Sequence, residues 1–169
     1  MGVPADTMPS TDLDAAIASF CAGVSSAEAG DRFLPPHWQD GDWKRLFRFT
    51  STRRVKAGEA LIRRGEPDRT LYFVLRGNLE VVAHSGDGLS MGPLTRVGAG
   101  SVLGEQSFFD GEPRSASVWA VKDCEVAAIT PEQYRAFEAS HPDLAREFLF
   151  ALGRILAIRL RRTTAKVRG

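Results

Sequence analysis

The sequence has little of what a disulfide scaffold or a metal enzyme requires. Its 169 residues include two cysteines, Cys21 and Cys124, and three histidines, His37, His84 and His141. Two distant cysteines without metal-binding spacing predict free, buried thiols rather than a bridge. The histidines lie in three separate segments, so they do not form the cluster of ligands that a catalytic metal needs. No nucleophile motif pairs a serine or cysteine with a histidine, and we therefore expect no enzyme.

A large net charge and a long apolar run are also missing. Lys and Arg number 22 and Asp and Glu 21, so the formal net charge of +1 favours neither nucleic acid nor a membrane surface as a partner. No apolar run approaches the length that crosses a membrane, and the first ten residues lack the basic region of a signal peptide. We expect a cytoplasmic location. Because 43% of the residues are hydrophobic, the chain can build one domain with a full core.

Short apolar runs separated by turn residues begin at Ser51, and this pattern is typical of an all-β fold. Glycine marks most of the breaks, as in Gly77-Asn78 and Gly98-Ala99-Gly100. The expected strands cover residues 52–56, 60–64, 70–76, 79–84, 94–97, 101–103, 116–121 and 125–129. Eight short strands with glycine turns predict a mainly β fold with flanking helices, namely an eight-stranded double-sheet jelly roll.

Helical patterns lie on both sides of the expected strands. Residues 1–49 predict a disordered start followed by N-terminal helices, because apolar residues recur there at helical spacing. This segment could be a regulatory lid, but we favour a structural cap. After the strands, Thr130 and Pro131 are typical of a helix start. A long C-terminal helix is then expected from about Asp143 to Val167.

The long helix carries an apolar stripe that is wider than packing against one domain requires. Part of the stripe could bury against the sheets and part against a second copy, so we predict a homodimer. The alternative is a helix packed only on its own domain. Six basic and no acidic residues lie between 154 and 169. Basic side chains favour a helix C-terminus, which explains them without an acidic partner or nucleic acid, the other interpretation of this segment.

The stretch from Gly104 to Ser117 interrupts the strands and carries the candidate chemistry. A glycine before a short helix lets backbone N–H groups approach an anion, because no Cβ intervenes and the helix start leaves donors unpaired. The planar fork of Arg114 matches a phosphate, and the hydroxyl of Ser115 can add a bond. Glu105 only accepts hydrogen bonds when ionised, so it suits a sugar hydroxyl. Together these residues predict a ribose-phosphate site.

Gly104-Glu105 followed by Pro113-Arg114-Ser115-Ala116 resembles the phosphate-binding cassette of the cyclic nucleotide-binding domain family. The resemblance extends over residues 47–168. It implies that Glu105 bonds the ribose 2′-hydroxyl, while Arg114 and Ser115 hold the cyclic phosphate. The implied ligand is a 3′,5′-cyclic nucleotide, and cAMP is expected in preference to cGMP. No cofactor or metal is implied.

One departure from the family concerns the residues after the cassette glutamate, which are usually apolar and then small. Here they are Gln106 and Ser107. The side chain of Gln106 could loosen packing beneath a ligand or could point to solvent. It favours the competing hypothesis, an interaction module that has kept the fold and lost the ligand. A site for a cyclic dinucleotide is a third hypothesis.

The resemblance also implies that polar residues of the long helix close over the base. Counting forward from Pro142 points to Arg159 and Leu160, whereas the local sequence pattern points to Thr163 and Thr164. The two registers differ by four residues and so share nearly the same helical face. The candidate ligand-binding residues are Gly104, Glu105, Gln106, Ser107, Arg114, Ser115, Ala116, Arg159, Thr163 and Thr164.

The implied domain covers residues 50–169, with the cassette at 101–117 and the C-terminal helices at 130–168. In the resembling transcription factors a helix-turn-helix follows this domain, and the present sequence ends where it would begin. We therefore expect no sequence-specific DNA binding. A stand-alone receptor of this kind would signal through movement of the C-terminal helix to an unknown downstream protein.

Overall fold

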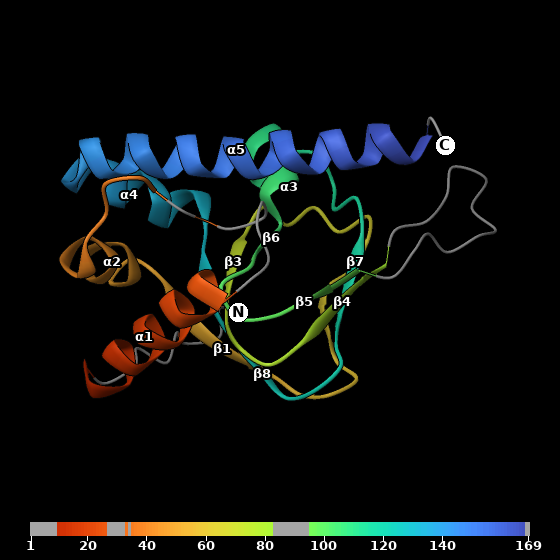
Figure 1. The fold of residues 1–169 in the computed structure, drawn as a ribbon, viewed down its shortest axis with the longest axis horizontal. Coiled ribbons are helices and arrows are strands. Elements are labelled where there is room, and N and C mark those ends of the chain that lie inside the picture. The colour runs from red at the N-terminus through yellow and green to blue at the C-terminus, as the bar shows by residue number, and fades with distance from the viewer. Residues whose placement is uncertain (1–9, 27–32, 34, 83–94, 168–169) are drawn as a thin grey trace.

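The computed structural model describes residues 10–26, 33, 35–82 and 95–167, and these form two antiparallel sheets with helices along one side (Figure 1). One sheet has the strand order β1-β8-β3-β6 and the other β2-β7-β4-β5. The strands are β1 Ser51–Val55, β2 Ala60–Ile62, β3 Leu71–Arg76, β4 Leu79–Val82, β5 Thr95–Val97, β6 Val102–Leu103, β7 Ser117–Ala120 and β8 Cys124–Ile129. The helices are α1 Ser10–Ser26, α2 Asp40–Phe47, α3 Glu105–Asp110, α4 Pro131–Ser140 and α5 Pro142–Val167.

The jelly roll expected from the sequence is confirmed, as are the flanking helices and the long C-terminal helix. Most expected strand ends differ from the observed ones by one or two residues. The second strand, for example, ends at Ile62 because the chain then turns through Gly65, whose φ is 84°. The disordered start was expected over residues 1–10, but α1 begins at Ser10. Residues 1–9, the end of the fourth expected strand at 83–84 and the start of the fifth at 94 lie outside the described residues.

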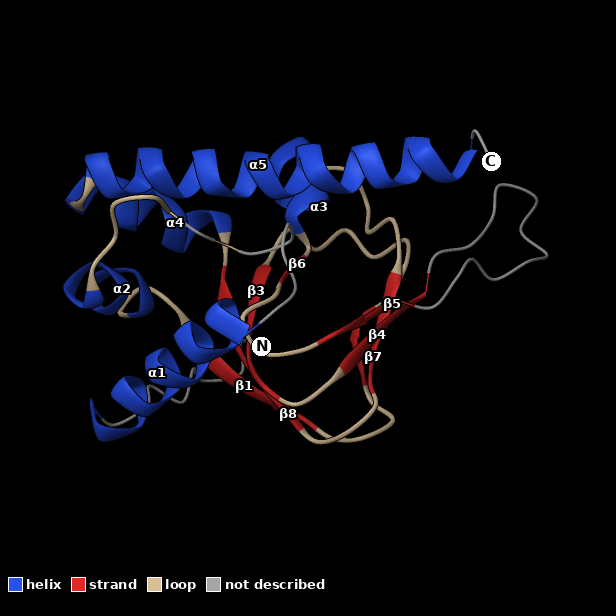
Figure 2. Cartoon of the chain, in the orientation of Figure 1, coloured by secondary structure: helices blue, strands red, loops and turns tan. Residues whose placement is uncertain are grey.

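Strand β3 is buried on both of its faces, which explains its continuous apolar run. Tyr72 and Val74 belong to the cluster between the two sheets. Leu71, Phe73 and Leu75 point the other way, into a second cluster that the helices cover. Figure 2 shows these helices gathered on one side of the sheets. The fold therefore has two cores on the two faces of one sheet, since β8 and β6 also contribute to both clusters.

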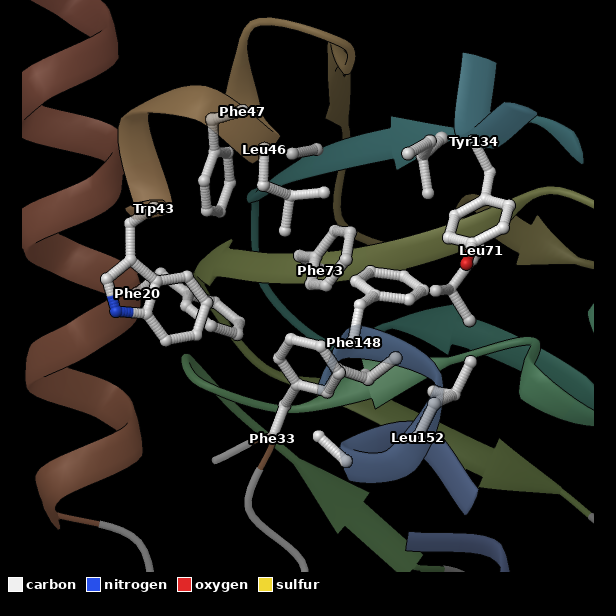
Figure 3. Packing of buried hydrophobic residues seen from close by; sticks show 14 of the residues in the cluster. Phe20, Phe33, Trp43, Leu46, Phe47, Leu71, Phe73, Tyr134, Phe148 and Leu152 are labelled. Carbon is white, nitrogen blue, oxygen red and sulfur yellow. The ribbon is translucent and has the colours of Figure 1, made fainter. Parts of the chain in front are cut away.

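The helix-covered core is rich in aromatic rings drawn from distant parts of the chain (Figure 3). Phe20 of α1 is fully buried, and its ring centroid lies 5.6 Å from that of Phe73. Phe33 bridges the N-terminal and C-terminal segments, with its ring 5.2 Å from that of Phe148 on α5. Tilted and edge-on pairs at these distances are favourable beyond the area they bury. The helices at both ends of the chain are thus packed into one cluster.

The two thiols differ in their surroundings. Both cysteines are free, but only Cys124 is buried, while Cys21 is half-buried. The expectation of two buried thiols was therefore wrong for Cys21, because its place on α1 leaves part of it facing solvent. Burial raises the pKa of both thiols. Within the described residues no cluster of potential ligands could hold a metal ion, and no helix is long and apolar enough to cross a membrane.

Helix α1 lies close against the turn before β6 at Gly23. A Cβ on Gly23 would lie 2.3 Å from the carbonyl carbon and oxygen of Ala99. We expect Gly23→Ala to lower the free energy of unfolding by about 1–3 kcal/mol, as other overpacking substitutions do. Gly41→Ala is the matched control, since its nearest atom would be 3.9 Å away and alanine favours a helix. Denaturant unfolding measures the free energy of unfolding of Gly23→Ala and Gly41→Ala. If the two variants were equally stable, the close contact at Gly23 would be contradicted.

Candidate ligand-binding site

Gly104 joins β6 to α3 and requires glycine for two reasons. Its φ of 86° lies in the left-handed region, where a side chain is strained. A Cβ here would also lie 2.5 Å from Nη1 of Arg114 and 2.7 Å from the carbonyl oxygen of Thr70. The missing side chain therefore lets the guanidinium pass directly beneath the start of α3, where Nη1 donates to the carbonyl of Gly104 at 3.2 Å.

Arg114 is only 3% exposed, which is unusual for an arginine. Its Nη2 donates to Oδ2 of Asp68 and, at 2.6 Å, to the carbonyl of Thr70. Its Nε is buried and has no hydrogen-bond partner among the described residues. An uncompensated buried donor costs about 1–3 kcal/mol, and a phosphate oxygen is the kind of acceptor that would satisfy it.

The loop between β2 and β3 holds both ends of the cassette. Asp68 accepts from the backbone N–H and the hydroxyl of Thr70 at 3.0 and 2.7 Å, and it then pairs with Arg114. Arg69 donates to the carbonyls of Ser107 and Phe108 in α3. Burial acts to raise the pKa of Asp68, but the hydrogen bonds from Thr70 and Arg114 outweigh it and hold the pKa below its ordinary value.

Sequence reasoning missed Asp68 and Arg69 as parts of this site. The signal that could have pointed to them is their place directly after Gly65-Glu66-Pro67, within the range 47–168 over which the family resemblance extends. Two opposite charges next to each other in a turn are ordinary at a surface. Only the return of the chain through β3 and β6 shows that one faces Arg114 and the other faces α3.

The long helix reaches the cassette through an apolar contact of Phe148 with Phe108 of α3 and through the side chain of Arg159. Nη1 of Arg159 lies 2.7 Å from Oε1 of Glu105, and Nη2 donates to the carbonyl of Val102 at 2.8 Å. Glu105 is 6% exposed, so this is a largely buried ion pair. In Figure 1, α5 runs across α3 at this point. Helix α5 is therefore fastened to the carboxylate that we expected to bind a ribose.

The other expected helix residues lie farther along α5 and do not contact the cassette in the same way. Thr163 and Thr164 are exposed, and their hydroxyls donate to the helix carbonyls of Arg159 and Leu160 at 3.1 and 3.0 Å. The structure brings Arg159 to Glu105, whereas Leu160, the other residue of the register counted from Pro142, is 67% exposed, and which residues close over a base stays a prediction.

The remaining cassette residues divide into buried and exposed ones. Ser107 lies within α3 and is 2% exposed, and Ala116 is half-buried just before β7. Gln106 and Ser115 are both exposed, and the hydroxyl of Ser115 donates to Oε1 of Gln106 at 2.6 Å. Because Gln106 faces outward, it does not loosen the packing beneath the site. Of the two expectations for this residue, the structure agrees with the outward one.

A hollow of about 480 Å³ lies elsewhere, at the open edge of the sandwich beside β1 and β2. Arg53 and Arg63 line it together with Glu59 and Glu66. None of the residues that line this hollow holds a buried polar atom without a partner among the described residues, whereas the cassette holds Nε of Arg114. We therefore place the candidate site at the cassette.

The structure is a β-sandwich whose cassette combines the glycine-started helix α3 with a buried guanidinium, an arrangement that can bind a small anion. The model of the cyclic nucleotide-binding domain matches residues 52–141. The chain belongs to the cyclic nucleotide-binding domain family.

Two of the similar proteins are bacterial transcriptional regulators. The chain is 38% identical over 115 residues to the cAMP-activated global transcriptional regulator CRP of Haemophilus influenzae, covering 68% of this chain and 49% of that protein. It is 36% identical over 119 residues to the regulator Vfr of Pseudomonas aeruginosa, covering 68% and 53%. The chain thus spans about half the length of these relatives.

Solved structures agree on the fold. A cyclic nucleotide-binding domain from Methylobacillus flagellatus superposes with a TM-score of 0.78 at 22% identity, over 92% of this chain and 84% of that one. The catabolite activator protein of Thermus thermophilus gives 0.69 at 28% identity, over 80% and 62%. A c-di-GMP-responsive regulator from Xanthomonas campestris gives 0.65 at 27% identity, over 77% and 63%.

Proposed function

We propose that this chain is a receptor for a 3′,5′-cyclic nucleotide, with cAMP as its ligand and without catalytic activity. The observation that carries the proposal is Arg114, a buried guanidinium whose Nε has no partner among the described residues and which lies against Gly104. The two relatives named above are cAMP-activated by description, which supports cAMP as the first nucleotide to test.

In this proposal Arg114 and the backbone at the start of α3 hold the cyclic phosphate, and Glu105 accepts the ribose 2′-hydroxyl. Arg114 is already fixed by Asp68, Thr70 and Gly104, so little side-chain freedom remains to be lost on binding. Because Arg114 is 3% exposed, neighbouring atoms of the cassette must move before an anion reaches its Nε. The outward position of Gln106 removes the main reason for preferring a degenerate module.

The ion pair between Arg159 and Glu105 gives the ligand a route to α5. A ribose hydroxyl that bonds Glu105 shares this carboxylate with Arg159, so binding changes the free energy of the contact between α5 and the cassette. A ligand shifts such an equilibrium only as far as its affinities for the two states differ. We propose that movement of α5 carries the signal to a downstream protein.

Arg159→Ala should uncouple α5 from the ligand. We expect cAMP to slow amide exchange in residues 155–167 of the wild type by about tenfold, the mark of a local opening that becomes less frequent. In Arg159→Ala this ligand-dependent slowing should disappear, because the ion pair to Glu105 is gone. Arg161→Ala is the matched control, an exposed arginine on the same helix. Equal protection in both variants would refute this route.

Helix α5 also carries an apolar face that its own domain leaves exposed. Phe150, Gly153, Ala157, Leu160 and Thr164 follow one another at alternating spacings of three and four. This is the spacing of a two-stranded coiled-coil seam. Phe150 is 79% and Leu160 67% exposed, whereas Phe148, Ala151, Leu152 and Ile155 pack into the core. We propose that a second copy of the chain covers this seam.

A charge placed in the seam should separate the two copies. We expect Leu160→Glu to weaken self-association by at least about 100-fold, because like charges would face each other across the pair. Val121→Glu is the control, since Val121 is an exposed apolar residue outside α5. Sedimentation equilibrium measures both variants. A wild-type chain that stays monomeric, or a Leu160→Glu variant that still dimerises, would exclude this interface.

A further inference from the structure

We infer that Gln106 limits the affinity of the cassette by competing with the ligand phosphate for the single proton of Ser115. This inference rests on the proposed function, because it assigns an effect on cyclic nucleotide binding to a residue outside the buried part of the site. Gln106 acts through Ser115 and is therefore a positioning residue.

The pair joins the two ends of the cassette. Gln106 lies in the first turn of α3. Ser115 lies nine positions after Gln106 in the sequence, directly next to Arg114. The hydroxyl of Ser115 donates to Oε1 of Gln106, and the oxygens lie 2.6 Å apart. This distance is at the short end of the range for O–H···O hydrogen bonds, so the contact is fully formed.

A serine hydroxyl has one proton to donate. An ionised cyclic phosphate offers only acceptors, so Ser115 must donate to it if the two are to be hydrogen-bonded. The same proton cannot serve Oε1 of Gln106 at full strength. The ligand therefore breaks the bond between Ser115 and Gln106 or binds without Ser115. In both cases Gln106 makes the nucleotide bind less tightly than the rest of the cassette allows.

The position of the pair limits the size of this effect. Arg114 and Glu105 are buried, and their ionic contacts are expensive to break. Gln106 and Ser115 are exposed, so water can replace a lost partner and the net contribution of one neutral hydrogen bond is small. We therefore expect a competition that changes the dissociation constant by about threefold to tenfold and leaves the fold unchanged.

A double-mutant cycle tests the inference. Calorimetric titration with cAMP is carried out on the wild type, Gln106→Leu, Ser115→Ala and the double variant, with thermal unfolding as the check of folding. Gln106→Leu should bind cAMP about fivefold more tightly, because Ser115 can then donate to the phosphate. In the Ser115→Ala background the same substitution should have no effect. Gln106→Glu keeps the acceptor and adds a negative charge, so it should bind more weakly than the wild type.

The outcomes separate this inference from the proposed function. If Gln106→Leu folds normally and binds no more tightly than the wild type, the competition does not exist. A gain that persists in the Ser115→Ala background would show that leucine acts by packing, and it would also overturn the inference. If the folded wild type and all variants bind neither cAMP nor cGMP, the proposed function itself fails and the inference falls with it.

Discussion

Arg114→Ala is expected to remove almost all affinity for cAMP. The loss should be about 2–3 kcal/mol or more, roughly 30-fold to 150-fold in the dissociation constant, because a bound anion loses a charge-assisted partner. Arg114 is the residue through which the cassette, the β2–β3 loop and the phosphate would meet. It already contacts Asp68, Thr70 and Gly104, and its Nε is the donor left for the ligand.

Arg114→Lys separates charge from geometry. Lysine keeps the positive charge but is a single compact donor group, so it cannot reproduce the planar fork that reaches three protein acceptors and a phosphate. We expect this variant to recover only part of the lost affinity. Both variants also leave Asp68 without its partner, so titrations belong at a temperature where circular dichroism shows each variant folded. An Arg114→Ala variant that binds like the wild type would place the site elsewhere.

Phe20→Ala should have the largest effect on stability. Phe20 is fully buried, and its ring packs against those of Trp43, Phe47 and Phe73. Replacing a buried phenylalanine by alanine costs about 3–5 kcal/mol, since the lost burial and the remaining cavity both count. Phe109→Ala is the control, because Phe109 is 41% exposed and its loss should cost less than about 1 kcal/mol. Thermal and denaturant unfolding measure both.

This experiment also decides between a cap and a lid at the N-terminus. We propose a cap, because α1 contributes to the same aromatic cluster as β3 and α5. A lid would open and close over the ligand without carrying the stability of the domain. If Phe20→Ala unfolded like the wild type and changed only the affinity for cAMP, the lid would be the correct interpretation.

The architecture could be predicted from the sequence because its turns depend on the residues at the turns themselves. Glycines at positions such as Gly77 and Gly100 have positive φ, so each turn could be placed without knowing the fold. The helix after Thr130 was equally local, since Thr130 caps it and Pro131 begins it. The lengths of the strands were less predictable, because a strand ends where its hydrogen bonds to the neighbouring strand end.

The site was predictable only in its central residues. Gly104, Glu105 and Arg114 could be read from one continuous stretch, because their chemistry and spacing lie close together in the chain. The contact from Arg159 to Glu105 joins residues 54 positions apart and depends on the register of a long helix. The role of Asp68 depends in the same way on how β3 returns beside β6. Such contacts depend on how distant segments pack together, and a local sequence pattern does not predict this packing.

The most direct test of the central claim is calorimetric titration of the purified chain with cAMP, followed by cGMP. The proposed receptor should bind cAMP with a dissociation constant on the order of a micromolar or below, and Arg114→Ala should weaken this binding by at least about 30-fold. Binding of cGMP alone would keep the receptor and change its ligand. No heat and no thermal stabilisation with either nucleotide would contradict the account and leave an interaction module built on the same fold.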